Sequence, residues 1–545
     1  MLLRLVALLA VVLLSAAHAV AQPAAPPVKY PVKYWVFFAD KPADAARGTA
    51  LRIALAPRTA ERRHLRGNPA RPAGLDVPVA ASYVDALRAM GVEPVVESRW
   101  FNAVSAVLTP EQAEAIRALP FVRGLQPVAR LATERTVAPT PEPVSPVVID
   151  YGPSQLQLDL INARLPIEDG FTGEGVIVGF LDTTFDFAHP ALAHVDLLGY
   201  ENFTGQEQSN THGLSVASVA VGFDEGDLVG PGFDAAVLAA TTEYAPSETH
   251  QEEDFFVAGM EWMEANGADV VNVSLGYSVF DAGEGDFTYD DMDGNTTLVT
   301  RAADLAAAFG IAVVTSAGNE GSSDWLYITA PADADSVIVA GAMRVDSTKA
   351  SFSSIGPTVD GRTKPDVMAL GVSVVIARSD GGYSMGNGTS FSAPAVTGVV
   401  AQMLQANPTL TPIAVRDMLR ATASQSAAPD NERGWGVVNA AAAVQQAIAL
   451  ATDDPGTPQP TDAVLYPTLL RRDRQTVTMR LTSSDFGQRV TLRLYDVLGR
   501  RVAVLYEGPP RLSPVSLMLP PLRTGVYFYR FTGDDLDTGG RIVVQ

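Results

Sequence analysis

The 545-residue sequence contains no cysteine, and it has only six histidines and five tryptophans. The absence of cysteine excludes disulfide bonds, thiolate metal sites, iron–sulfur clusters and a cysteine nucleophile. Beyond the N-terminal region, no uninterrupted apolar run approaches the roughly 18 residues that suggest a transmembrane helix. Hydrophobic residues nevertheless make up 47% of the chain and charged residues 18%, so the sequence can form packed cores.

Positive charge is also scarce, and it is unevenly placed. The net charge is −22. Residues 1–150 hold 17 basic and 12 acidic side chains, residues 151–450 hold 10 and 39, and residues 451–545 hold 12 and 10. A strongly acidic body repels a phosphate backbone, so we expect no nucleic-acid partner. The changes in charge predict boundaries near residues 150 and 450.

The first residues have the pattern of an export signal, which we assign to 1–21. Arg4 is followed by the apolar run Leu5–Leu14 and then by small residues that fit a cleavage site. We therefore expect a protein that is exported through the periplasm and is secreted or held at the cell surface. Its mature form is expected to have no transmembrane helix.

Residues 30–135 are predicted to form a small α+β unit. Strand patterns at Tyr34–Phe38 and Trp100–Leu108 alternate with helical spacing at Ala80–Met90 and Pro110–Leu119. The Pro-rich segment 136–146 that follows reads as an extended linker that a protease could reach.

Residues 147–449 are predicted to be an α/β domain. Short apolar runs at Val176–Leu181, Val270–Ser274, Ala312–Ser316 and Val337–Ala340 are typical of buried parallel strands. Helical stretches separate them, for example Glu253–Ala265. This order predicts a doubly wound, mostly parallel sheet with its ligand site beyond the carboxyl ends of the strands.

The C-terminal region is predicted to be a β-sandwich, residues 463–545, joined to the body by a linker at 450–462. Apolar residues recur with period two, as at Val477, Met479 and Leu481. A generic adhesion or carbohydrate-binding sandwich is one interpretation of this region.

Polar residues with chemical potential follow the ends of predicted strands and begin predicted helices. Asp182 follows a buried strand, His212 begins a helix of small residues, and Asn319 follows another strand in Ala317-Gly318-Asn319. Each alone has an ordinary interpretation as a turn or cap residue. His189 precedes Pro190, which favours a structural role.

Ser390 lies in Gly388-Thr-Ser-Phe-Ser-Ala-Pro394, at the expected start of a helix. We expect Gly388 to allow close approach of the backbone and Pro394 to lie in the first helical turn, where its missing N–H is not needed. The N–H groups at a helix start favour developing negative charge. Together, Asp182, His212, Ser390 and Asn319 could supply acid, base, nucleophile and oxyanion donor.

These motifs resemble those of the subtilisin-like serine peptidases (subtilases), in which Asp, His and Ser follow in the same order. The resemblance covers about 150–449 and includes Gly434-Trp-Gly436. It implies a serine endopeptidase that hydrolyses proteins or peptides through an acyl-enzyme, without a cofactor. It also implies that Ser274, Leu275 and Gly276 line the substrate cleft together with Ala317 and Gly318. Thr184 and Leu214 depart from the family pattern, which usually has Gly and Thr there.

The flanking regions carry further resemblances. Residues 30–130 resemble the inhibitor-like propeptide of subtilases, which implies that the chain inhibits its own peptidase domain. The tail resembles the C-terminal sorting domain of the type IX secretion system, on Leu494–Arg500, Leu522–Phe528 and Gly539–Val544. It implies the type IX secretion machinery as a partner. The tail departs from the usual opening at Tyr466-Pro-Thr468.

Two alternatives stay open at this point. Because of Thr184 and Leu214, the chain could be a catalytically silent relative that binds peptides at a surface. The acidic loop Asp290–Asn295 has carboxylates at alternate positions around a Gly, as calcium loops do, but it lacks the full pattern. We favour a capped helix start before Thr297 and expect no metal site. A lipase or esterase is disfavoured because Ser390 lacks a Gly-x-Ser-x-Gly elbow.

Overall fold

The computed structural model describes residues 32–41, 55–68, 74–128 and 149–452 and, in the C-terminal region, 463–466, 469–470, 476–481, 489–496, 500–509, 515–523, 525–533 and 537–544. The predicted export signal and the linker at 136–146 lie outside these residues, as does most of the linker at 450–462. No helix within the described ranges has both the length and the apolar character to cross a membrane.

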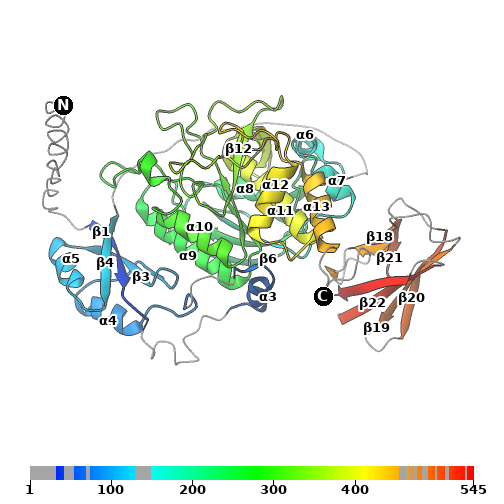
Figure 1. Ribbon diagram of the computed structural model, residues 1–545, viewed down its shortest axis with the longest axis horizontal. Helices are drawn as coiled ribbons and strands as arrows, with labels where there is room; N and C mark the ends of the chain where they lie inside the picture. The colour runs from blue at the N-terminus through cyan, green and yellow to red at the C-terminus, as the bar shows by residue number, and fades with distance from the viewer. Residues whose placement is uncertain are drawn as a thin grey trace, which may run out of the picture.

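A seven-stranded parallel sheet forms the centre of the body (Figure 1). Its strands run in the order β13-β12-β11-β10-β5-β9-β6, and every neighbouring pair is parallel. Their bounds are β5 (Ile177–Asp182), β6 (Leu197–Asn202), β9 (Ala236–Thr241), β10 (Val270–Val273), β11 (Ala312–Ser316), β12 (Ile338–Met343) and β13 (Val367–Leu370). The α/β class and the doubly wound, mostly parallel sheet predicted from the sequence are confirmed.

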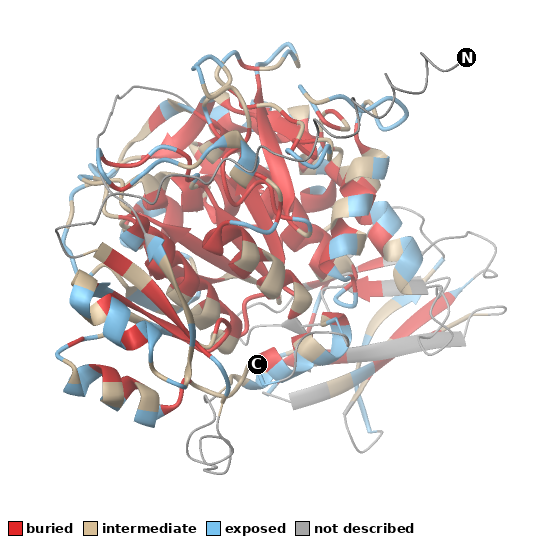
Figure 2. Cartoon of the chain, turned by 60° about the vertical axis from the view of Figure 1, so that its left-hand side comes forward, coloured by how far each residue is buried: buried red, intermediate tan, exposed pale blue. Residues whose placement is uncertain are grey.

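Helices cover both faces of this sheet. On one face lie α9 (His250–Asn266) and α10 (Leu298–Ala308), and on the other lie α8 (His212–Val221), α11 (Thr389–Ala406), α12 (Pro412–Thr422) and α13 (Ala440–Thr452). Successive residues of a strand pack against opposite helix layers: Ala312 and Val314 belong to one apolar cluster and Val313 belongs to the other. The strands are therefore largely buried (Figure 2), with the exception of β6 at one edge of the sheet, most of which is exposed.

The strand order reverses at β5, which has β10 on one side and β9 on the other. In the register of β5 with β10, Leu181 pairs with Val273. Asp182 and Ser274 therefore leave neighbouring strands at the same edge of the sheet. A crevice at such a switch point is where open parallel sheets place their ligands.

Shorter elements complete the body. These are α6 (Gln155–Leu160), α7 (Arg164–Glu168), the hairpin β7 (Phe223–Asp224) with β8 (Leu228–Val229), and the hairpin β14 (Val372–Ala377) with β15 (Tyr383–Asn387). Short 3₁₀ helices occur at Gly152–Ser154, Pro190–Leu192 and Tyr289–Asp291.

The N-terminal unit is an antiparallel sheet in the order β2-β3-β1-β4 with two helices. Its elements are β1 (Val32–Phe38), α4 (Ala81–Ala89), β2 (Val96–Ser98), β3 (Ala103–Leu108), α5 (Pro110–Arg117) and β4 (Val122–Val128). Val36 and Phe38 enter the unit's own core, whereas Trp35 and Phe37 enter the cluster of α9 and α10. One face of the sheet is therefore buried against the body.

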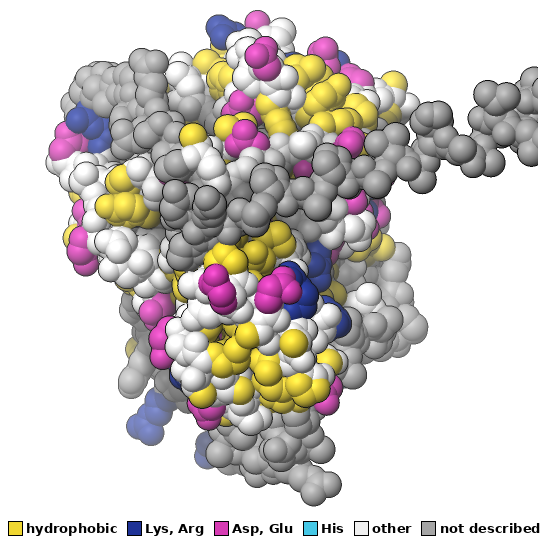
Figure 3. All heavy atoms as spheres, turned by 90° about the vertical axis from the view of Figure 1, so that its left-hand side faces the viewer, with side chains coloured by type: hydrophobic (Ala, Val, Ile, Leu, Met, Phe, Trp, Pro, Cys, Tyr) yellow, Lys and Arg dark blue, Asp and Glu magenta, His cyan; other side chains and the backbone are white. Residues whose placement is uncertain are grey.

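One helix of this unit was not predicted. Helix α3 (Pro57–Arg66) is inserted between β1 and α4 and lies against the body, apart from the other helices of the unit (Figure 1). The side of the molecule that carries the unit shows Lys and Arg in a few small groups among hydrophobic and acidic side chains (Figure 3). Several basic residues of the N-terminal unit, including Arg62, Arg66 and Arg99, are buried and not at this surface.

The C-terminal region forms two sheets around one apolar cluster, as expected for a sandwich. One sheet is β16-β18-β21 and the other is β17-β23-β22-β19-β20, with only β17 and β23 parallel among the described pairs. The bounds are β16 (Ala463–Tyr466), β17 (Leu469–Leu470), β18 (Thr476–Leu481), β19 (Val490–Asp496), β20 (Arg501–Gly508), β21 (Val515–Met518), β22 (Gly525–Thr532) and β23 (Asp537–Val544).

Some predicted boundaries move by a few residues. Strand β3 begins at Ala103 and not at Trp100, because the preceding residues form a turn in which Asn102 has φ +49°. Helix α9 begins at His250, earlier than predicted. A capping box between Thr249 and Glu252 fixes that start.

Candidate active site

Asp182 and His212 form the first contact of the site. Asp182 is the last residue of β5 and is fully buried, and His212 is the first residue of α8. His212 Nδ1 lies 2.8 Å from Asp182 Oδ1. The same oxygen accepts the backbone N–H of Thr183 at 2.7 Å. These bonds offset the cost of burying a carboxylate, and they leave Nε2 of the imidazole as the atom that can act on a substrate.

The environment of His212 favours its charged form. Burial opposes protonation of the ring, but the charge of Asp182 and the hydrogen bond to it outweigh burial and raise the pKa of His212 above its ordinary value. The side chain stays 29% exposed. The imidazole is therefore a stronger base than usual and remains within reach of solvent.

A polar network that the sequence analysis did not assign positions these two residues. Asn210 Oδ1 accepts the backbone N–H of His212 at 2.9 Å and the Thr183 hydroxyl at 3.3 Å. Thr183 Oγ1 in turn accepts the backbone N–H of Gly213 at 3.1 Å. The network ties the start of α8 to the end of β5. An Asn two residues before a helix start is a recognisable signal for such a turn.

Ser390 is the second residue of α11 and is partly exposed. Its hydroxyl donates to the Ser274 carbonyl at 3.4 Å, and the Ser274 hydroxyl donates to the Ser390 carbonyl at 2.8 Å. The ring of Phe391, the next residue, lies 5.8 Å from the His212 ring between centroids. The imidazole is therefore beside the start of the helix that carries Ser390.

The expected position of Pro394 in the serine motif is wrong. Pro394 lies inside α11 and not in its first turn. Four residues before it is Ser390, whose carbonyl would accept the N–H that proline lacks. That carbonyl is instead free to accept the Ser274 hydroxyl. Proline therefore releases an acceptor that joins the helix to Ser274, the residue that follows β10.

The reason expected for glycine at position 388 is also wrong: its backbone angle requires glycine, and close approach of another part of the chain does not. Its φ is +151°, in a range that residues with a Cβ rarely adopt. A Cβ built there would meet only ordinary contacts, the nearest being Ser390 N at 3.6 Å. Space at this position is therefore not what excludes a side chain.

Asn319 follows β11 and is exposed. Its Oδ1 accepts both the backbone N–H and the hydroxyl of Thr389, at 2.9 and 3.0 Å. With the oxygen held in this way, the Nδ2 group keeps its donors for another acceptor at the start of α11. Thr389 lies within the serine motif, but sequence reasoning gave it no role.

The two predicted cleft segments meet at Thr329. A Cβ on Gly276 would come within 2.3 Å of the Thr329 hydroxyl, and the Thr329 N–H donates to the Ala317 carbonyl at 3.4 Å. The Leu275 carbonyl accepts the Ser316 hydroxyl at 3.3 Å, and Gly318 has φ +103°. Ser274–Gly276 and Ala317–Gly318 therefore flank one residue. No sequence motif pointed to Thr329.

The two residues that depart from the family pattern, Thr184 and Leu214, are joined by a backbone hydrogen bond. Leu214 is fully buried in the cluster beneath α8, and its N–H donates to the Thr184 carbonyl at 3.2 Å. Leu214 therefore acts as a core residue. Neither side chain takes the place of an atom of Asp182 or His212.

The remaining candidates have structural explanations. His189 is buried, with Nδ1 accepting the Ala191 N–H and Nε2 facing the Gly382 carbonyl at 3.1 Å. In the acidic loop, Asp293 accepts the N–H groups of Asn295 and Thr296. Within the described ranges, no group of three or more His, Asp or Glu side chains is arranged to hold a metal ion.

Comparison with known proteins identifies the family. Residues 173–436 match the family model described as Subtilase family, and residues 33–141 match the Peptidase S8 propeptide domain, Bacteroidota. The chain is 34% identical to Subtilisin DY of Bacillus licheniformis over 304 residues, which is 54% of this chain and 99% of that protein. It is 32% identical to Subtilisin NAT of Bacillus subtilis subsp. natto, covering 54% of this chain and 71% of that one.

A solved structure, that of the Prenylagaramide maturation protease PagA, matches 52% of this chain and 98% of its own, with 24% identity and a TM-score of 0.43. From the sequence relatives, the chain belongs to the subtilase family, and it is a serine-type endopeptidase. Its N-terminal unit is a propeptide domain of that family, which supports its role as an intramolecular inhibitor.

Proposed function

We propose that this endopeptidase cleaves peptide bonds through an acyl-enzyme formed on Ser390, with His212 as base and Asp182 as its partner. The observation that carries the assignment is the 2.8 Å contact between His212 Nδ1 and Asp182 Oδ1, with the imidazole beside the start of α11. This contact occupies Nδ1 and leaves the other ring nitrogen, Nε2, for the proposed proton transfer.

The chemistry follows from this arrangement. Ser390 Oγ attacks the substrate carbonyl as its proton passes to His212 Nε2, and His212 then gives that proton to the leaving amine. Water attacks the acyl-enzyme by the same proton path and releases Ser390. The hydroxyl contact to Ser274 is long, 3.4 Å, so little opposes rotation of Ser390 toward the imidazole. Each step uses a protein group, so the proposed reaction calls for no cofactor.

The oxyanion of the tetrahedral intermediate is bound by Asn319 Nδ2 and the Ser390 backbone N–H. The fixed orientation of Asn319 Oδ1 supports the first donor, and the position of Ser390 at the start of α11 supports the second. The segments Ser274–Gly276 and Ala317–Gly318 bind the substrate backbone in the cleft between them. Protein or peptide substrates reach this cleft after the propeptide leaves.

The proposed domain limits follow the charge pattern and the linkers of the sequence. The export signal is 1–21, the propeptide 30–135, the peptidase domain 147–449, the linker 450–462 and the sorting domain 463–545. Export through the periplasm and sorting by the type IX machinery are part of this proposal. They rest on the sequence motifs and are supported by the sandwich architecture of the tail.

A fluorophosphonate probe and the Ser390→Ala variant test the assignment. The processed wild-type protein should be labelled on Ser390, and Ser390→Ala should stay an uncleaved, folded precursor that does not degrade casein. Degradation of casein by Ser390→Ala would refute the assignment. Absence of labelling after propeptide removal would instead support the silent, peptide-binding relative.

A further inference from the structure

Helix α3 supplies hydrogen-bond donors to the ends of two helices of the body. Helices α9 and α10 end near each other, and the last carbonyls of any helix lack partners within it. The Thr59 hydroxyl donates to the Glu264 and Ala265 carbonyls at 3.0 Å each. Arg62 donates to the Ala268 carbonyl at 2.7 Å and the Phe309 carbonyl at 3.2 Å. The propeptide therefore caps both helices with side chains from a single helix.

The same helix brings cations to two buried carboxylates. Arg58, Arg62 and Arg66 are spaced by four residues, which places them along one face of α3. Arg62 pairs with Glu264 at 2.6 Å, and both side chains are fully buried. Arg58 and Arg66 both pair with Asp269, which is also buried. The negative ends of α9 and α10 add to the attraction for these cations.

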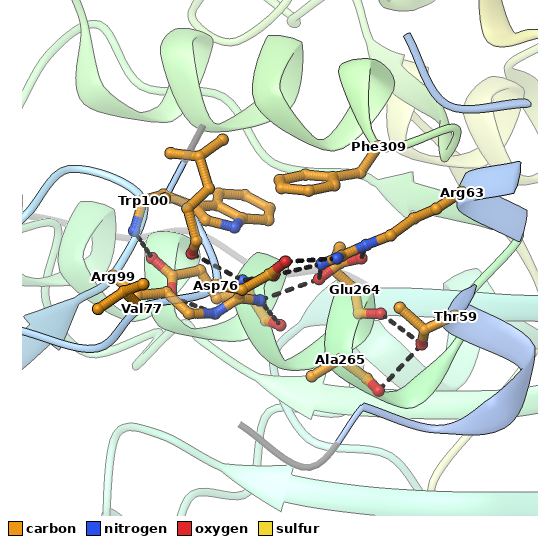
Figure 4. Close-up of polar contacts among 12 residues, drawn as sticks. Thr59, Arg63, Asp76, Val77, Arg99, Trp100, Glu264, Ala265 and Phe309 are labelled. Carbon is orange, nitrogen blue, oxygen red and sulfur yellow. Dashed lines mark hydrogen bonds and ion pairs between the residues drawn. The ribbon is translucent and has the colours of Figure 1, made fainter. Parts of the chain in front are cut away.

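A second segment of the propeptide reaches the same carboxylate. Arg99, in the turn before β3, donates to Glu264 at 3.0 Å, and Arg63 of α3 donates to it at 2.8 and 2.9 Å (Figure 4). Beside them the Trp100 ring stacks on Phe309, with 5.4 Å between centroids. Three guanidinium groups from two segments thus converge on Glu264.

This cluster lies at the N-terminal ends of the sheet strands, and the active site lies at their C-terminal ends. Asp269 Oδ2 accepts the N–H of Ile177, the first residue of β5, at 2.9 Å, whereas Asp182 is the last residue of that strand. At about 3.3 Å per residue, the two ends of β5 are roughly 16 Å apart. A ligand at the α3 position therefore leaves the cleft open.

Among the residues that the structure describes, the body contributes only acceptors to the contact with α3 and Arg99. Every hydrogen bond and ion pair recorded for the Glu264 carboxylate within the described residues comes from an arginine of the propeptide. When the propeptide leaves, Glu264, Asp269 and the terminal carbonyls of α9 and α10 become accessible together. They match the planar, multiply donating guanidinium group better than a compact ammonium.

We propose that Glu264, Asp269 and the C-terminal carbonyls of α9 and α10 form a guanidinium-binding exosite on the processed enzyme, which accepts a helical segment with arginines spaced by four residues. In the precursor, α3 is its occupant. The exosite rests on the propeptide leaving the peptidase domain, but not on catalysis by Ser390. The propeptide also packs Trp35 and Phe37 of its sheet against α9 and α10, and a basic helical peptide competes with it only at the exosite.

Release of the propeptide tests the exosite without any catalytic step. The full chain carrying Ser390→Ala receives a foreign protease site within 136–146, is cut there, and the rate at which the N-terminal piece dissociates is measured by biolayer interferometry. Arg62→Ala should speed dissociation by about 100-fold or more, because it leaves buried Glu264 with fewer cations. Arg62→Lys should recover little of this loss, since a lysine cannot reach the same set of acceptors.

Arg88→Ala is the matched control. Arg88 is exposed, and its ion pairs with Asp85, Glu93 and Glu97 all lie within the propeptide, so dissociation should stay unchanged. Glu264→Gln, which keeps the propeptide intact, should speed release as Arg62→Ala does. Unchanged dissociation in both Arg62→Ala and Glu264→Gln would overturn the exosite, whatever the state of the active site.

A synthetic peptide of residues 55–68 separates the exosite from the cleft. It should bind the processed enzyme, lose binding when Arg58, Arg62 and Arg66 are replaced by alanine, and leave hydrolysis of a small chromogenic peptide unchanged. It should fail to bind enzyme carrying Glu264→Gln. Absence of binding up to about 1 mM, or inhibition of the small substrate, would overturn the proposal.

Discussion

Replacing Thr389 by valine tests how Asn319 is oriented for catalysis. Asn319 Oδ1 accepts two bonds from Thr389, one from its backbone N–H and one from its hydroxyl. Thr389 is fully buried, and valine has nearly its shape, so the substitution removes the hydroxyl bond and little else. The backbone bond remains, and Asn319 becomes freer to turn its donors away from the oxyanion.

The expected loss is smaller than that of removing Asn319 itself. One hydrogen bond contributes about 0.5–1.5 kcal/mol, which corresponds to roughly 2- to 12-fold in rate. Asn319→Ala removes the donor altogether and should cost about 10²–10³ in kcat. Because the donor acts on the transition state, Thr389→Val should lower kcat and leave KM unchanged. Thr389→Ser, which keeps a hydroxyl, should restore most of the rate.

A double-mutant cycle on a chromogenic peptide substrate decides whether Thr389 acts through Asn319. If it does, Thr389→Val should have almost no effect on kcat in an Asn319→Ala background. An equal loss of kcat in the presence and absence of Asn319 would refute the reasoning, since Thr389 would then act by another route. Circular dichroism and the thermal midpoint of each variant check that the fold is retained.

Two further predictions follow from the site. His212 must be neutral to accept the Ser390 proton, and its pKa is raised, so kcat/KM should fall as the pH drops through a value above 6.5. Asp182→Asn should shift this acid limb of the pH profile to lower pH and lower kcat by about 10⁴. An acid limb at or below pH 6.5 in the wild-type enzyme would contradict the assignment. Leu214→Ala should destabilise the peptidase domain by about 2–5 kcal/mol, measured by calorimetry, and leave kcat per folded molecule unchanged. A loss of kcat without a loss of stability would show instead that the Leu214 side chain contributes to catalysis.

The sequence predicts strands β5, β10, β11 and β12 of the central sheet well because they are buried on both faces, whereas the edge strand β6 is mostly exposed and has no such run. Runs such as Ala312–Ser316 appear as uninterrupted apolar segments, and β11 has those same bounds. Asp182 and Asn319 could be singled out because Asp182 directly follows such a run and Asn319 comes three residues after another. Their convergence, by contrast, depends on the reversal of strand order at β5, which no local pattern records.

Pro394 and Thr389 mark the limit of local reasoning within the motif itself. Whether proline falls in the first or second turn depends on where α11 begins, and the structure starts the helix at Thr389, close to the serine. A shift of one turn changes the explanation of Pro394 from a tolerated residue to one that frees the Ser390 carbonyl. The role of Thr389 likewise requires knowing that the loop after β11 approaches that helix start.

Helix α3 could not be predicted because it has no apolar stripe. Its sequence, Pro-Arg-Thr-Ala-Glu-Arg-Arg-His-Leu-Arg, reads as a solvated basic segment, yet Thr59, Arg62 and Arg66 are buried. Their burial depends on carboxylates and carbonyls some 200 residues further along the chain. Only the charge asymmetry between a basic N-terminal segment and an acidic body hints at this pairing.

The energetics of this contact favour selectivity over raw affinity. Burying Glu264 with Arg62, Arg63 and Arg99 removes four charged groups from water, and that penalty offsets much of their mutual attraction. When the propeptide leaves, the same carboxylate regains water, so the processed enzyme does not retain an unpaired buried charge. A ligand with fewer donors would remove the same water from Glu264 and the helix carbonyls but would form fewer hydrogen bonds and ion pairs with them in return. The arrangement thus discriminates by the number and geometry of donors, which is why arginines at fixed spacing, and not positive charge in general, define the partner.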